Sequence, residues 1–291
     1  MKLMPFNFDR INDDTVFLSN LAGFHQLLSE ENFSQLVGHS LPDDQTLADA
    51  LESKLFISGD DELAFTASVL SSGFAKRVMS DLTVNPIFMI VPTLRCDHTC
   101  KYCQVSRAAV GAKDYDLEPS LIPLIVNQIK KLSLPPYKIE VQGGEPLLRF
   151  DLVQLLYKQC EESLGADAFE MVIATSLSLL ESSILTWVKE RNITFSVSLD
   201  GSETIHNKNR LLTDNKSHSK AADGIRWIKE DLGKSRVSTV TTVTKELIKS
   251  PSSIIEAHLA LGLTDLFVRP VSPYGFAHKD NFSFSMDEYY G

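Results

Sequence analysis

The sequence predicts an α/β protein in two parts: a partial (β/α)6 barrel over residues 83–291, preceded by a small mixed α/β module over residues 1–82. From residue 87 onward, apolar β-branched runs alternate with amphipathic stretches, an order that favours parallel strands joined by helical crossovers. The runs are apolar almost throughout, which is typical of a sheet covered on both faces. A closed eight-stranded barrel takes about 250 residues, so the shorter chain indicates an open one.

Six strands are predicted in the barrel, at residues 87–92, 139–142, 171–175, 195–199, 237–243 and 266–268. Between them, apolar residues recur at helical spacing, for example at Ile122, Ile125 and Ile129. The helices are therefore expected at residues 122–132, 151–163, 181–190, 225–232 and 253–261. Residues 285–290 have the pattern of a further helix that is only beginning, so we expect the sequence to be truncated at its C-terminus, as a piece of a longer protein.

The N-terminal module has a different pattern. Two short strands are predicted at residues 15–18 and 25–28, and a helix begins at Ser29 with Glu30 and Glu31 in its first turn, where acidic groups are favourable. Further helices fit residues 45–55 and 62–79. This order indicates a winged-helix-like module. It could bind a peptide by adding it to a sheet edge, or serve only as a structural cap on the barrel.

Charge, apolar run length and cysteine distribution exclude several classes of protein. The formal net charge is −10, which argues against a nucleic-acid partner, because binding a polyanion needs a basic face. The longest apolar runs have the length of strands, far below the ~20 residues of a membrane-spanning helix, and the N-terminus has no secretory pattern. We therefore expect a cytoplasmic protein without a membrane partner. Three of the four cysteines lie within eight residues, unlike the spread cysteines of a disulfide scaffold.

Those three cysteines form the candidate metal or cluster site. Cys96, Cys100 and Cys103 have the spacing Cys-x3-Cys-x2-Cys directly after the first barrel strand, at the end where barrels carry their active sites. Three thiolates can ligate three irons of a [4Fe–4S] cluster and leave the fourth iron open. The alternatives are a structural zinc site, which needs a fourth ligand, and a chance cluster. His98 lies inside the loop, poorly placed to join the sulfurs, and Cys160 lies in a predicted helix, where a buried apolar role is expected.

A second motif follows the next strand. Gly143 and Gly144 precede Glu145 and Pro146, and two glycines allow the backbone to come close to a ligand.

Arg269 lies at the end of the sixth predicted strand. Two roles are open for its side chain: it points into the mouth of the barrel, or it forms a structural ion pair with an acidic residue.

Together, these motifs resemble the radical S-adenosylmethionine (SAM) superfamily, with Tyr102 in the aromatic position before the last cysteine. The resemblance implies a [4Fe–4S] cluster on the three cysteines and SAM as cofactors. The methionine amino and carboxylate groups chelate the open iron, and reductive cleavage of SAM gives methionine and a 5′-deoxyadenosyl radical. The cofactors carry this chemistry, so no catalytic acid or base is predicted.

The resemblance also implies which residues contact SAM. The Gly-Gly-Glu-Pro turn holds the methionine amino group, and Ser176 stands where the family commonly has Asn. Ser198 and Arg210, twelve residues apart, match a pair that binds the cofactor carboxylate in peptide-modifying members, as a hydroxyl and a guanidinium can. The expected cofactor-binding residues are Tyr102, Gly143, Gly144, Glu145, Ser176, Ser198, Arg210 and Arg269.

A closer similarity, over residues 3–8, 100–107, 142–147 and 269–277, is to the His-Xaa-Ser system radical SAM maturases. It implies a peptide or protein substrate with His-Xaa-Ser repeats, a reductant such as flavodoxin or ferredoxin, and a cysteine-rich C-terminal region that is missing here. Two other functions stay open: a radical SAM enzyme acting on a small molecule or RNA, and a non-enzymatic iron–sulfur or zinc-binding protein.

Overall fold

The computed structural model describes residues 1–42, 44–82, 86–272, 274–278, 284 and 286–290. The chain divides into two compact units, Met1–Val84 and Asn85–Gly291. Each unit is described by itself.

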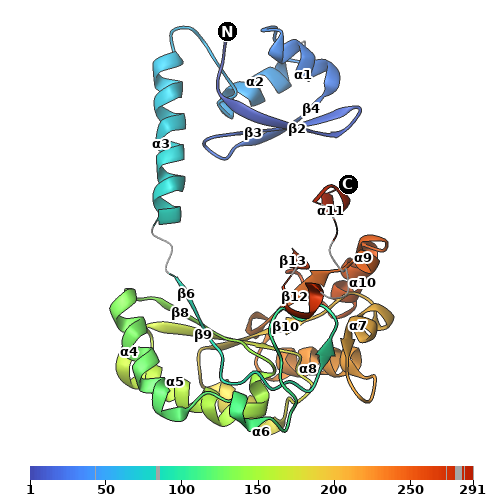
Figure 1. Ribbon diagram of the computed structural model, residues 1–291. Coiled ribbons are helices and arrows are strands. Elements are labelled where there is room, and N and C mark those ends of the chain that lie inside the picture. The colour runs from blue at the N-terminus through green and yellow to red at the C-terminus, as the bar shows by residue number, and fades with distance from the viewer. Residues whose placement is uncertain (43, 83–85, 273, 279–283, 285, 291) are drawn as a thin grey trace. The chain divides into compact units, whose positions relative to one another are not determined.

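The larger unit is built on a curled parallel sheet of six strands in the order β13-β12-β10-β9-β8-β6 (Figure 1). Every neighbouring pair in this sheet is parallel. This architecture confirms the partial (β/α)6 barrel. The strands are β6 (Ile87–Ile90), β8 (Tyr137–Val141), β9 (Phe169–Thr175), β10 (Ile193–Ser198), β12 (Val237–Val243) and β13 (Phe267–Pro270).

Helices pack along one face of this sheet (Figure 1). Alternate strand residues such as Val141, Ile173 and Val197 are fully buried against helix residues such as Leu156 and Ile225, because successive side chains of a strand point to opposite faces. This period of two buries one row of the strands at residues 137–141, 169–175 and 193–198, whereas the two edge strands have no fully buried residue. The main helices are α4 (Ile122–Leu132), α5 (Phe150–Leu164), α6 (Ser182–Lys189), α8 (Ser217–Asp231) and α10 (Ser252–Ala260).

The strand boundaries differ from the predicted ones by a few residues. β8, β9 and β10 begin earlier than predicted, while β6 ends at Ile90, before Pro92, which has no N–H to donate to a ladder. Several short elements had no signal in the sequence. They are β7 (Thr99–Cys100), β11 (Arg210–Leu211), α7 (Glu203–Asn209), α9 (Lys245–Ile248) and the 3-10 turns η1 (Lys113–Tyr115), η2 (Pro119–Leu121), η3 (Pro146–Arg149), η4 (Lys234–Arg236) and η5 (Gly275–His278). The helix α11 (Met286–Tyr290) lies within the range 285–290 where the sequence predicted a helix to begin.

The smaller unit combines an antiparallel sheet with three helices. The sheet contains β2 (Phe6–Asn12), β3 (Thr15–Asn20) and β4 (His25–Ser29), and β1 (Lys2–Leu3) pairs with β5 (Ile57–Ser58). Its helices are α1 (Glu30–Val37), α2 (Gln45–Ser53) and α3 (Leu63–Leu82). Ser29 caps α1, because its Oγ accepts a hydrogen bond from the Asn32 N–H at 3.1 Å. β2 was missed because most of its residues are exposed.

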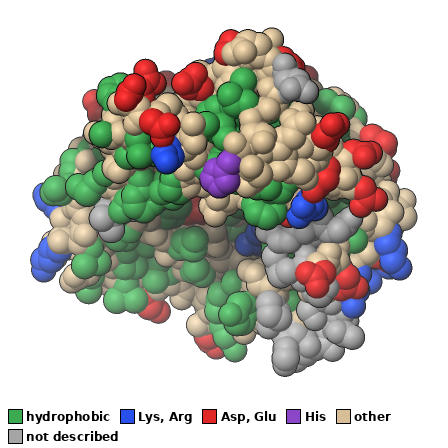
Figure 2. Space-filling model, turned by 90° about the horizontal axis from the view of Figure 1, so that it is seen from above, with side chains coloured by type: hydrophobic (Ala, Val, Ile, Leu, Met, Phe, Trp, Pro, Cys, Tyr) green, Lys and Arg blue, Asp and Glu red, His purple; other side chains and the backbone are tan. Residues whose placement is uncertain are grey.

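The chain has more acidic than basic residues, 38 against 28. Figure 2 shows Asp and Glu side chains spread over one face, with Lys and Arg side chains scattered among them. Within the described part of the chain, no helix is both long enough and apolar enough to cross a bilayer.

Candidate active site

The cysteine loop leaves β6 and lies directly against the Gly-Gly-Glu-Pro turn that follows β8. The Gly144 N–H donates to the Thr93 carbonyl at 2.9 Å, and the Glu145 N–H donates to the Arg95 carbonyl at 2.8 Å. A Cβ atom on Gly143 would lie 2.3 Å from the Thr93 oxygen, and one on Gly144 would lie 2.1 Å from the Arg95 oxygen. Only glycine therefore permits this contact, which brings two of the predicted motifs together.

The three cysteines of this loop are free thiols and partly buried. Burial raises the pKa of Cys96, and the neighbouring Cys100 thiolate raises it further. Burial also raises the pKa of Cys100 to about 11, although the Arg210 guanidinium counteracts it. Buried thiolates need a nearby cation or a metal to offset their charge. Three soft sulfur donors on one short loop fit an iron–sulfur cluster. Cys160, by contrast, is fully buried in α5, as predicted.

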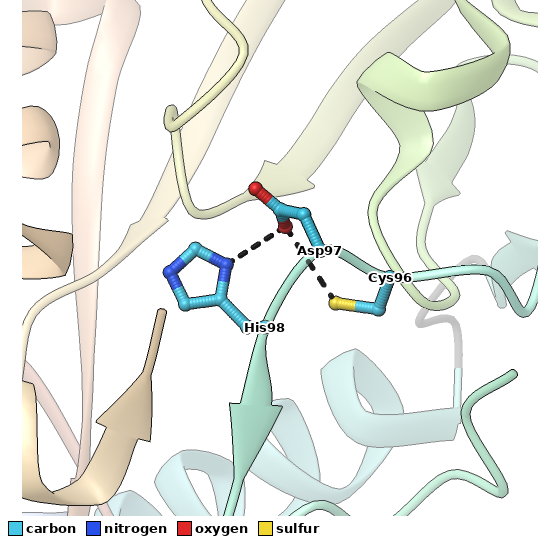
Figure 3. A group of neighbouring side chains, drawn as sticks. All are labelled: Cys96, Asp97 and His98. Carbon is cyan, nitrogen blue, oxygen red and sulfur yellow. Dashed lines mark hydrogen bonds and ion pairs between the residues drawn. The ribbon is translucent and has the colours of Figure 1, made fainter. Parts of the chain in front are cut away.

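Asp97 and His98 offer the alternative ligands of this loop. Their donor atoms and the Cys96 sulfur all lie within 4.8 Å of one another, which is close enough for a metal site (Figure 3). However, His98 Nδ1 lies 2.8 Å from Asp97 Oδ1, and His98 Nε2 lies 2.8 Å from Ser217 Oγ. Asp97 Oδ2 accepts a hydrogen bond from Ser178 at 2.6 Å. Both side chains are thus engaged with protein partners, which disfavours a zinc site completed by His98.

A buried cluster of charge forms where β11 pairs with β7. Arg210 and Cys100 are register partners in this pair, and Arg210 Nη1 lies 3.8 Å from Cys100 Sγ. Arg210 Nε lies 3.3 Å from the carboxylate of Asp200, and the guanidinium lies over the Tyr102 ring. The Tyr102 hydroxyl donates a hydrogen bond to the same carboxylate. The short β7–β11 pair therefore places a guanidinium beside a cysteine sulfur.

Glu145 and Ser176 contact each other. Ser176 donates from its backbone N–H at 2.9 Å and from its hydroxyl at 2.7 Å to Glu145 Oε2, and Thr175 donates to Oε1 at 2.6 Å. Burial raises the pKa of Glu145. The carboxyl group thus joins the end of β8 to the end of β9, and the structure brings these two predicted site residues together.

Ser198 and Arg269 lie at the carboxyl ends of other strands. Ser198 is the half-buried last residue of β10. Arg269 is exposed on β13, where it pairs in register with Thr242 and donates from Nε to the Thr242 hydroxyl at 3.4 Å. The carboxyl ends of parallel strands share one edge of a sheet, so all of the predicted contacts come from loops or strand ends on that edge.

Two acidic residues of the site, one fully buried and one partly buried, were not predicted. Asp200 is fully buried and accepts from the Thr242 N–H at 3.2 Å in addition to its contacts with Tyr102 and Arg210. The sequence feature that could have indicated this role is its position as an acidic residue between an apolar strand and Gly201. Asp116 accepts two hydrogen bonds from Arg95, both at 2.8 Å, and one from Arg149 at 2.6 Å. Nothing in the spacing indicated that pairing.

One curated relative has been matched, over part of the chain. An uncharacterised protein of Methanocaldococcus jannaschii, MJ0907, is 28% identical over 111 residues, which are 38% of this chain and 37% of that protein.

Solved structures show the same fold. anSMEcpe with bound AdoMet has a TM-score of 0.59 at 17% identity, covering 70% of this chain and 57% of that one. Streptococcus suis SuiB bound to precursor peptide SuiA has a TM-score of 0.51 at 18% identity, covering 94% of this chain and 64% of that one. The chain thus spans less than two thirds of the length of each of these relatives.

The sequence also matches the Radical SAM superfamily over residues 90–250, a stretch that includes the cysteine loop and the whole of the strands β8, β9, β10 and β12. With more than half of its length matched, the chain belongs to the radical SAM superfamily, and a [4Fe–4S] cluster and S-adenosylmethionine are the cofactors that this membership implies.

Proposed function

We propose that this chain is the catalytic part of a radical SAM maturase, which binds its cluster through Cys96, Cys100 and Cys103 and modifies a ribosomally made peptide. One observation carries the cluster assignment. The loop with the three free thiols is fixed by backbone hydrogen bonds to a glycine turn that tolerates no side chain. Such close packing leaves the backbone of the turn beside the loop, where a ligand of the cluster can be held.

The chain's own residues bind and orient the cofactor. When bound, the cluster and SAM together supply the 5′-deoxyadenosyl radical that abstracts a hydrogen atom from the substrate. We assign the SAM contacts to the predicted set: Tyr102, Gly143, Gly144, Glu145, Ser176, Ser198, Arg210 and Arg269. Arg210 Nε is a buried donor without a hydrogen-bond partner among the described atoms, although it lies within ion-pair distance of Asp200. A guanidinium has five N–H donors, so Arg210 can donate to the carboxylate of SAM while its Nε faces Asp200.

A peptide substrate is supported by the kind of molecule found with both structural relatives. anSMEcpe has been solved with a Cp18Cys peptide, and SuiB with the precursor peptide SuiA. The sequence similarity to His-Xaa-Ser maturases favours a substrate with those repeats. In the smaller unit, which we propose to be winged-helix-like, β2 and β4 are the outer strands of the three-stranded sheet, where a peptide strand could be added. A flavodoxin or ferredoxin in the cytoplasm would serve as reductant.

Anaerobic reconstitution tests the cluster and the reaction. We expect about four irons per chain, as a [4Fe–4S] cluster requires, and 5′-deoxyadenosine after dithionite and SAM are added. Cys96→Ala should abolish both, because the cluster loses one of three anchors. Cys160→Ala is the matched control, since this thiol is buried in α5 and should leave iron loading unchanged. A colourless protein with one zinc would refute the proposal.

Co-expression with a peptide that carries His-Xaa-Ser repeats tests the substrate class. Mass spectrometry should show a mass change that is absent when the Cys96→Ala chain is co-expressed. If the wild-type chain cleaves SAM but leaves every such peptide unchanged, the substrate assignment is wrong and a small-molecule substrate is favoured.

A further inference from the structure

A line of hydrogen bonds joins Glu145 and Ser176, which are assigned to SAM, to Asp97 and His98 of the cysteine loop, which are not. On the side of β8 and β9, Glu145 Oε2 lies 2.7 Å from Ser176 Oγ, which lies 2.8 Å from Ser178 Oγ. Ser178 then donates to Asp97 Oδ2 at 2.6 Å. The ends of two strands are therefore connected to the loop through its aspartate.

The other side of the line leads to α7 and α8. His98 Nε2 lies 2.8 Å from Ser217 Oγ, and the same hydroxyl lies 3.0 Å from His206 Nε2. His206 Nδ1 accepts the Asp200 N–H at 3.1 Å. His98, His206 and Ser217 are each at most 2% exposed, so water does not compete for these bonds.

The hydrogen bonds on this side can all be assigned a donor and an acceptor in one consistent way. Because His206 Nδ1 accepts a backbone N–H, its ring hydrogen is on Nε2 and donates to Ser217. Burial lowers the pKa of His206 well below its ordinary value, which keeps the ring neutral. The Ser217 hydrogen is then available to His98 Nε2, and the His98 Nδ1–H donates to Asp97, since a carboxylate can only accept. Both sides of the line thus end on Asp97.

The order Ser217, His98, Asp97 is also that of a serine-hydrolase triad. A nucleophile must reach a substrate, whereas Ser217 is 2% exposed and its oxygen already accepts a hydrogen bond from His206. The arrangement therefore holds the loop in place and does not attack a substrate.

We propose that Asp97 is a positioning residue, which fixes the Cys96 end of the loop and lowers the reduction potential of the cluster. The inference rests on the proposed function. Asp97 Oδ1 lies between the His98 ring and the Cys96 sulfur, 3.9 Å from the sulfur (Figure 3). Its side chain is only 14% exposed, so its charge is weakly screened. A negative charge beside a cluster disfavours the addition of an electron, and net charge is one of the factors that set such potentials.

Asp97→Asn tests the role, because the amide has the same size but no charge and only one accepting oxygen. Asp114→Asn, an exposed change of the same charge in η1, is the control. Iron content, the electron paramagnetic resonance spectrum of the reduced cluster and its midpoint potential are measured on reconstituted full chains. We expect a higher potential and an altered spectrum for Asp97→Asn, and wild-type values for Asp114→Asn.

Ser178→Ala keeps the charge on Asp97 and removes the two hydrogen bonds of the Ser178 hydroxyl, to Asp97 and to Ser176, so it should alter the spectrum with a smaller change in potential. A folded Asp97→Asn chain that takes up no iron would support the role of Asp97 in positioning the loop. Both Asp97 oxygens are hydrogen-bonded to protein groups, so the loss of iron would not mean that Asp97 is itself a ligand. Wild-type spectra and potentials in both variants would overturn the inference while the proposed function stands. A wild-type chain that binds no cluster would instead overturn the proposed function.

Discussion

At the scale of single residues, the site depends on buried charges that are paired before any cofactor arrives. Asp200 accepts from Tyr102, faces Arg210 and accepts the Thr242 N–H, so three segments of the chain meet at one carboxylate. Removing one partner of a buried pair leaves the other charge uncompensated, which costs more than the pair contributes. The polar residues around the cysteines therefore act as a unit.

Arg210→Ala should weaken SAM binding at least tenfold while the cluster still loads, because the three sulfurs remain. A factor of ten corresponds to about 1.4 kcal/mol, within the range of a charge-assisted hydrogen bond. Arg210→Lys keeps the charge without the planar fork and should recover only part of the affinity. Equilibrium binding of SAM to reconstituted chains measures the effect. Wild-type affinity in the alanine variant would contradict the assigned role.

At the scale of elements, the glycine turn and the cysteine loop behave as one structure. Gly144→Ala should prevent stable cluster loading, because its Cβ would lie 2.1 Å from the Arg95 oxygen and the two backbones would have to separate. Gly111→Ala is the matched control, since nothing lies within 4 Å of its added Cβ. Iron per chain after reconstitution is the measurement. Equal loading of the two variants would show that the turn does not position the loop.

A second contact ties the loop to the start of α5. Asp116 accepts hydrogen bonds from Thr93, Arg95 and Arg149, and these outweigh the effect of burial and lower its pKa. Because the folded-state pKa is the lower one, the stabilisation is complete above the unfolded value of about 3.9 and is lost as the pH falls through the folded value.

Asp116→Asn should therefore lower the free energy of unfolding by about 3 kcal/mol at pH 7, and the difference from wild type should shrink below about pH 4. Urea unfolding followed by tryptophan fluorescence measures this, because Trp187 and Trp227 both lie in the barrel unit. A difference that stays constant with pH would mean that the ionised carboxylate is not what stabilises the contact.

The sequence predicted the elements better than their polar connections. Apolar runs located all six barrel strands, because burial between helices needs continuous apolar side chains. β2 was missed since its exposed residues carry no such constraint, and the β7–β11 pair was missed since two residues carry no period. The pairing of Cys100 with Arg210 depends on that short pair. The cysteine spacing and the glycine turn were visible because a cluster and a close backbone approach each demand one residue type.

At the scale of the whole molecule, we propose that the barrel unit carries the radical chemistry and that the smaller unit binds the peptide. Deleting residues 1–82 should leave iron loading and SAM cleavage intact, because the barrel unit has its own continuous core. Peptide affinity, measured by fluorescence anisotropy with a labelled His-Xaa-Ser peptide, should fall at least tenfold in the deleted chain.

Leu27→Pro makes the same test within the intact chain. Leu27 is 52% exposed on the edge strand β4, and proline there removes one N–H that an added strand could use. Ser53→Ala, an exposed change at the end of α2, is the control. We expect Leu27→Pro to weaken peptide binding without altering SAM cleavage. Unchanged affinity in both the deleted chain and this variant would assign the smaller unit a structural role and place peptide recognition in the barrel.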